Sequence, residues 1–112
     1  MARLEKVFKS IDEKPQGKKC PAIDGIIDEG KEIMDEYKGS PALDAGLLSS
    51  AQSIEHYEIT RYGTLVTWAN ELGNQEAVGL LEATLAEEKA TDEALTELAE
   101  AVVNQEAQQE AA

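Results

Sequence analysis

The sequence contains few cysteines and few basic residues, and each shortage excludes a class of protein. One cysteine among 112 residues excludes an internal disulfide framework and a cysteine-rich zinc module. Ten Lys and Arg against 23 Asp and Glu leave a net charge of −13. That charge argues against binding to nucleic acid and to anionic lipid.

Long apolar runs and leader sequences are missing as well. No run approaches the roughly 18 apolar residues of a membrane span, and the first six residues do not start a signal peptide. Since 42% of the residues are apolar, a folded core is expected rather than disorder. We therefore expect one soluble, cytoplasmic domain over residues 1–112 without nucleic-acid or membrane partners.

What the sequence does contain is helical patterning. Only five residues are aromatic, whereas Ala, Leu and Glu are abundant, a composition typical of helices. Apolar spacing predicts short helices over about 2–12 and 21–38 and long helices over about 41–72 and 75–105, with no strand. Gly73 and Asn74 lie between the two long helices as stop and cap signals. The predicted fold is all-α, with residues 41–105 as a long antiparallel core hairpin and 106–112 as a fraying tail.

Four carboxylates fall where the long helices should be apolar. On a helical wheel at about 100° per residue, Glu55 and Glu58 lie within the apolar stripe of the third helix, and Glu88 and Asp92 within that of the fourth. The predicted buried stripes comprise Leu47, Leu48, Ala51, Ile54, Tyr62, Leu65, Ala69 and Leu72, and Ala77, Val78, Leu81, Leu85, Leu95, Ala99, Val102 and Val103.

The four acids are also predicted to lie at one level of the hairpin. With the turn at residues 73–74, Glu55 is level with Asp92, and Glu58 with Glu88. Buried carboxylates at one level repel one another unless a cation neutralises them, and facing helices use such groups to hold two iron or manganese ions. The alternative is that the stripe edges are wet and the four acids face solvent.

Other residues with possible chemistry receive simpler interpretations. Tyr62 lies one turn beyond Glu58 and is either a core residue or a hydrogen-bond donor to a ligand carboxylate. His56, the only histidine, falls about 140° from the stripe centre, so we expect it to point away from the acids in a surface or inter-element role. Cys20 is interpreted as a small buried residue.

Three segments resemble a known family. Residues 20–29 (CPAIDGIIDE), 54–65 (IEHYEITRYGTL) and 85–95 (LAEEKATDEAL) together resemble the YciE/YciF family of bacterial ferritin-like, rubrerythrin-related proteins. The resemblance implies a four-helix bundle, a carboxylate-bridged dinuclear metal site and a role in the stress response. It implies Glu55, Glu58 and Glu88 as ligands. Where rubrerythrin-like relatives have a histidine after the last of these, this chain has Thr91 and Asp92.

The resemblance also implies helices that precede Met1. Family members have a full first helix and a full second helix with further ligands, whereas this chain starts near the end of the second. Because the hairpin alone cannot bury its stripe, we expect homodimerisation to complete the bundle. The alternative is that the chain is a fragment, with the first helices lost or supplied by another polypeptide.

Two functions remain open from the sequence. The first is a carboxylate-rich protein that binds a dinuclear iron or manganese centre, with iron oxidation (ferroxidase activity) or a stress-related redox role as an open question. The second is a helical oligomerisation or interaction module without metal chemistry. Metal-free acid–base catalysis has no accompanying substrate-binding feature.

Overall fold

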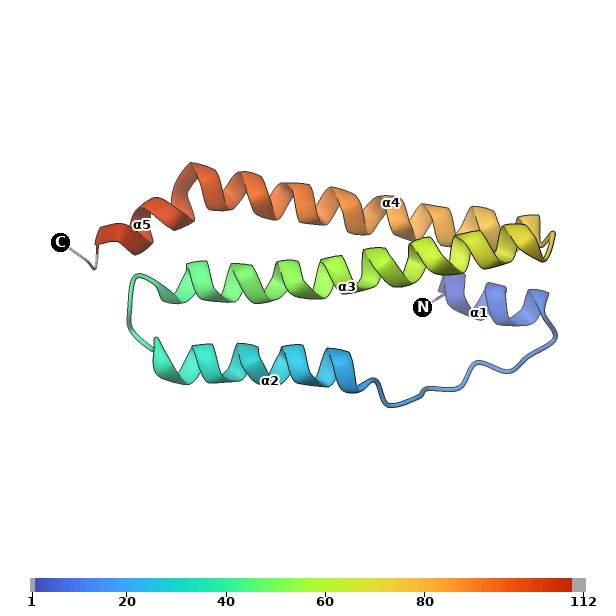
Figure 1. The fold of residues 1–112 in the computed structure, drawn as a ribbon, viewed down its shortest axis with the longest axis horizontal. Coiled ribbons are helices and arrows are strands. Elements are labelled where there is room, and N and C mark those ends of the chain that lie inside the picture. Colours follow the sequence, from blue (N-terminus) through green and yellow to red (C-terminus); the bar gives the residue numbers. More distant parts are fainter. Residues whose placement is uncertain (1, 110–112) are drawn as a thin grey trace. The chain divides into compact units, whose positions relative to one another are not determined.

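Residues 2–109 are described by the computed structural model, and all regular structure among them is helical. Figure 1 traces the elements in chain order: α1 (Ala2–Ser10), α2 (Pro21–Glu36), α3 (Leu43–Glu71), α4 (Gln75–Leu98), a π-helical segment η1 (Ala99–Val103) and α5 (Asn104–Gln108). The predicted all-α class is confirmed. No helix among these residues is both long and apolar enough to cross a membrane.

The described chain divides into two compact units. The first comprises residues 2–19 and 57–90, and the second comprises residues 20–56 and 91–109. Both α3 and α4 are divided between the units, so that each helix contributes one segment to the first unit and one to the second.

In the first unit, the end of α3 and the start of α4 form an antiparallel hairpin with a tight turn. Gly73 has a φ of 71°, a left-handed conformation that only glycine adopts without strain. The Asn74 amide donates to the carbonyl of Ala69 at 2.9 Å, and the Asn74 side chain accepts from the Ala77 amide at 3.1 Å. The predicted stop at Gly73 and cap at Asn74 are therefore confirmed.

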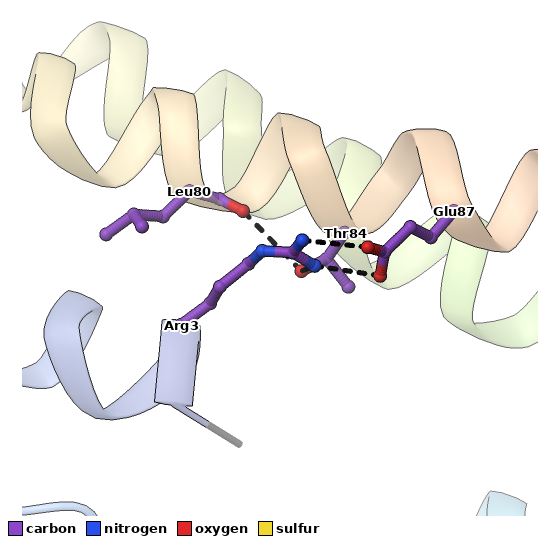
Figure 2. A network of polar contacts seen from close by, with 4 residues as sticks. All are labelled: Arg3, Leu80, Thr84 and Glu87. Carbon is purple, nitrogen blue, oxygen red and sulfur yellow. Dashed lines mark hydrogen bonds and ion pairs between the residues drawn. The ribbon is translucent and has the colours of Figure 1, made fainter.

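Helix α1 packs on this hairpin and completes a small core. Leu4 and Val7 contact a buried cluster of Ala69, Ala77, Val78 and Leu81. Arg3 donates two hydrogen bonds to the carboxylate of Glu87, at 2.7 and 2.8 Å, and one to Thr84 (Figure 2). Apolar packing and a two-point ion pair thus hold the helix on α4.

In the second unit, α2 lies close against the first part of α3. A Cβ atom built on Gly46 would lie only 2.7 Å from the Ile33 methyl group, so the absence of a side chain permits this approach. Further along, Leu48 packs with Ala99 and Val103, and Ala45 and Leu95 flank them. The core of this unit therefore joins α3 to the end of α4 and to η1.

The predicted helix ends differ from the observed ones by a few residues. Helix α1 ends at Ser10 rather than at residue 12, because Asp12 has a φ of 55° and the Glu13 amide reaches back to Phe8 at 3.0 Å, closing a Schellman turn. Helix α3 begins at Leu43, after Ser40 accepts a hydrogen bond from the Ala42 amide.

The C-terminal segment departs from the prediction in two respects. Helical structure continues through Gln108, so residues 106–108 of the predicted tail are helical, and residues 110–112 lie outside the described range. In the π-helical turn at Ala99–Val103, the backbone hydrogen bonds span five residues instead of four, so the turn contains about one more residue than an α-helical turn. As a result Val103 lies in the core with Ala99, whereas Val102, also predicted to be buried, is 44% exposed.

The predicted buried stripe of α3 is only partly buried. Leu48 and Ala69 belong to the cores, but Leu65 is 37% and Leu72 is 81% exposed. The wheel placed them correctly on one face of the helix. The described elements of the first unit nevertheless leave the edge of that face uncovered.

Candidate metal centre

Three of the four predicted carboxylates gather around Glu58. A carboxylate oxygen of Glu58 lies within 4.8 Å of a carboxylate oxygen of Glu55, which is one turn earlier in α3. In the first unit, the Glu58 oxygen also lies within 4.8 Å of a carboxylate oxygen of Glu88. All three side chains are partly buried, so the prediction that they lie in the stripe rather than in open solvent is supported by the fold.

Glu88 influences the ionisation of Glu58, since the two carboxyl groups lie close together. The pKa of Glu58 is raised above its ordinary value, first by burial, then by a hydrogen bond to Glu88 and by the charge of Glu88. These effects favour the protonated form of Glu58, because two ionised carboxylates so close would repel. A bound metal ion would compete with the proton for these oxygens.

Tyr62 adds a third polar group to this part of the first unit. It packs against the buried cluster of the hairpin. Its pKa is raised by burial and by the charges of Glu58 and Glu88. Tyr62 can therefore be both a core residue and a hydrogen-bond donor to a ligand carboxylate, as the sequence suggested. Its ring packs in the core, and the charges of Glu58 and Glu88 act on its hydroxyl group.

Glu55 has a buried carboxylate oxygen that lacks a donor among the described residues. Its Oε2 atom is buried and has no hydrogen-bond partner within the described part of the chain. A buried acceptor without a donor costs about 1–3 kcal/mol, a cost that a coordinated cation removes. The carboxylate oxygens of this group are the donors preferred by hard or borderline ions such as iron and manganese.

Asp92, the fourth predicted ligand, has other partners. Its Oδ1 atom lies 3.0 Å from His56 Nε2 and 3.4 Å from Gln52 Nε2, and Asp92 does not join the carboxylate group around Glu58. The expectation that His56 points away from all four acids is therefore wrong for Asp92. The His56 side chain, which is 68% exposed, lies at the edge of the α3 face and reaches across to α4 there.

Sequence reasoning did not identify Gln52 and Thr96, which belong to the same contact. Gln52 donates to Thr96 at 2.8 Å. The spacing of these residues could have indicated the contact. Gln52 precedes His56 by four residues, and Asp92 precedes Thr96 by four, so each pair lies on one face of its helix. In the predicted hairpin the two pairs lie at the same level.

Cys20, expected to be buried, is half-buried at the start of α2.

These features define an all-helical protein with a cluster of carboxylates in its long helices. A profile described as "Domain of unknown function (DUF892)" matches residues 1–108. The chain therefore belongs to the DUF892 family. Together with the similar proteins described next, this match confirms the resemblance to the YciE/YciF proteins.

Similar proteins and solved structures agree with this assignment. Protein YciF of Escherichia coli K12 is 44% identical over 110 residues, which cover 97% of this chain and 66% of that protein. The crystal structure of the E. coli stress protein YciF matches with a TM-score of 0.84 over 92% of this chain and 65% of that one. YcfI from Rhodopseudomonas palustris, described as a candidate structural protein, matches with a TM-score of 0.81 at 48% identity, over 85% and 60% of the two chains. The chain thus spans about two thirds of the length of these relatives.

Proposed function

We propose that this chain binds iron or manganese in a dinuclear centre through Glu55, Glu58 and Glu88. The observation that carries the proposal is the buried, unpartnered Oε2 atom of Glu55 on the helix that also presents Glu58. Glu58 can approach both of the other carboxylates, and carboxylates so close together can bridge two ions. Asp92 is left out of this ligand set because His56 and Gln52 already contact it.

The chemistry that such a centre would supply is electron transfer to oxygen or peroxide. The roles of the chain's own residues are narrower: the carboxylates bind the ions and release the shared proton, and Tyr62 offers a hydroxyl near them. In this proposal the protein works during stress, as the description of E. coli YciF as a stress protein suggests, and it does so in the cytoplasm. Metal binding is the primary claim, and iron oxidation depends on it.

The test is metal binding by isosteric variants. Untagged protein is stripped with a chelator, loaded anaerobically with Fe²⁺ or Mn²⁺, and analysed by elemental mass spectrometry after desalting. The wild type should retain the metal, and Glu58→Gln/Glu88→Gln should lose it. The control Glu82→Gln/Glu93→Gln removes two exposed carboxylates from α4, the helix that carries Glu88. This control should retain the metal.

Thermal stability gives a second measure of the same event. A ligand that binds only the folded state stabilises it by about 2.7 kcal/mol at 100 times its dissociation constant. The melting temperature of the wild type should therefore rise with Fe²⁺ or Mn²⁺, and that of the double variant should not. Retention of metal by Glu58→Gln/Glu88→Gln at the wild-type level would overturn the proposal.

The second candidate function is a helical interaction module that pairs with a second copy of the chain. It is favoured by an exposed stripe on α3, where Leu65 is 37%, Trp68 59% and Leu72 81% exposed. Arg61, stacked on Tyr57, and Glu71 flank this stripe. If two copies pair antiparallel about residues 66–67, Leu65 faces the Trp68 of the partner copy and the two flanking charges attract each other.

The oligomeric state of the metal-free protein tests this second function. Native mass spectrometry of metal-free wild type should show a homodimer, and Trp68→Gln should shift it to monomer. Ile27→Gln removes a similarly exposed apolar side chain in α2, which is 42% exposed, and should leave the dimer intact. A monomeric wild type at micromolar concentration would exclude this pairing.

A further inference from the structure

The second unit contains a polar hollow that the carboxylate group around Glu58 does not use. Its volume is about 550 Å³, and it lies between the first part of α3 and the later part of α4. The side chains that line it are all polar: Ser49, Gln52, Ser53, His56, Asp92 and Thr96. It holds the only histidine of the chain.

Three side chains in this hollow converge on one point. His56 Nε2 lies 3.0 Å from Asp92 Oδ1, and the Gln52 amide lies 3.4 Å from the same oxygen. The Gln52 amide is in turn held at 2.8 Å by Thr96. An imidazole nitrogen, a carboxylate oxygen and an amide group are thus assembled from two helices before any ligand arrives.

The charge of the hollow favours a cation. Asp92 is only 22% exposed, and no Lys or Arg is among the six lining residues. The whole chain carries a charge of −13, which attracts cations from solution. When the imidazole is neutral, the hollow presents a partly desolvated carboxylate beside a nitrogen donor.

We propose that His56 and Asp92 bind a divalent transition-metal ion of the zinc type, separately from the carboxylates around Glu58. Zinc accepts histidine nitrogen and carboxylate oxygen at about 2.0–2.2 Å. Donor atoms 3.0 Å apart therefore subtend about 90° at the ion, and a small outward movement of either side chain gives the tetrahedral angle. Gln52 supplies a third donor through its amide oxygen after rotation of the amide, and water completes the coordination.

The mixed nitrogen and oxygen donor set separates this site chemically from the other. Imidazole favours zinc, copper and nickel, whereas carboxylate oxygens alone favour harder ions such as manganese. The inference does not depend on the proposed iron or manganese centre, because the two sites share no residue. Since His56 and Asp92 come from α3 and α4, the bound ion would join the two helices within the second unit.

The test follows the single imidazole directly. Untagged, chelator-treated protein is titrated with Zn²⁺ by calorimetry and with Co²⁺ by absorption spectroscopy, and the His56 ring signals are followed by NMR. The wild type should bind one Zn²⁺ per chain, and Co²⁺ should broaden the ring signals. His56→Gln and Asp92→Asn should each weaken Zn²⁺ binding by more than about tenfold, since loss of even a ligand-orienting partner costs about 10–100-fold.

Two further variants make the outcome decisive. Glu58→Gln/Glu88→Gln should keep the calorimetric Zn²⁺ site, which shows that it is not the carboxylate group. Glu93→Gln, an exposed neighbour of Asp92, should bind as the wild type does. Melting curves of all metal-free variants establish that they are folded. Zn²⁺ binding that persists in folded His56→Gln, or a wild type that binds no Zn²⁺, would overturn the inference.

Discussion

Glu58 of α3 and Glu88 of α4 are joined by a hydrogen bond between two carboxyl groups, and this bond raises the pKa of Glu58 together with burial. The bond exists only while one of the two groups keeps a proton. The same pair can share one proton, and in the proposed function a cation would take the place of that proton. In that proposal, pH and metal supply would decide which of the two is bound.

The first prediction concerns pH and the metal-free protein. Because the folded-state pKa of Glu58 lies above its ordinary value of 4.5, the folded protein binds this proton more tightly than the unfolded chain does. Its stabilising effect is complete below 4.5 and is lost as pH rises through the higher folded-state pKa. Glu58→Gln, which needs no proton to donate, should be more stable than wild type at pH 7 and similar to it at pH 4. Urea unfolding at both pH values in a chelating buffer measures this.

The second prediction has the opposite sign and concerns Arg3. Arg3 lowers the pKa of Glu87 below 4.5, so the ion pair contributes stability above that value and loses it as pH falls through the folded-state pKa. Arg3→Gln should therefore destabilise the protein at pH 7, and the difference from wild type should shrink in acid. Lys6→Gln removes an equal charge from an exposed position of α1 and should have little effect. Equal destabilisation by both variants would mean that only net charge matters.

The third prediction tests the turn between α3 and α4. Asn74 caps α4 and also donates from its side chain to Ser10 at 2.9 Å. Asn74→Ala should cost about 1–2 kcal/mol, because loss of a cap costs about 1 kcal/mol and loss of a further hydrogen bond a similar amount. Ser10→Ala keeps the cap and should cost less. Chemical unfolding of both variants gives the comparison, and equal costs would show that the cap itself contributes nothing.

The fourth prediction uses two glycines of α3 that differ in their surroundings. A Cβ at Gly63 meets nothing within 4 Å, whereas one at Gly46 meets Ile33 at 2.7 Å. Gly63→Ala should stabilise by about 0.5–1 kcal/mol through helix propensity. Gly46→Ala should destabilise by about 1–2 kcal/mol, since overpacking outweighs the same gain. If thermal melting shows both variants stabilised, α2 does not pack closely on α3.

The helices and their turn follow from the sequence because they depend on local interactions. Apolar spacing defines α1 to α4 to within a few residues, and the Gly73–Asn74 pair ends one long helix and caps the next without help from distant residues. The level of Glu58 with Glu88 also follows, since helical rise is constant and the turn is short. Spacing along the chain is therefore enough to predict that these two carboxylates face each other.

Other features were decided only by tertiary structure. A helical wheel describes a straight, isolated helix, so it could not show that His56 reaches Asp92 across the edge of the interface, or that the π-helical turn moves Val102 out of the core. Burial of Leu65 and Leu72 depends on a covering surface, and their own spacing says nothing about whether one is present. The sequence by itself thus determined which residues share a face, whereas contacts between helices decided which partner each side chain meets.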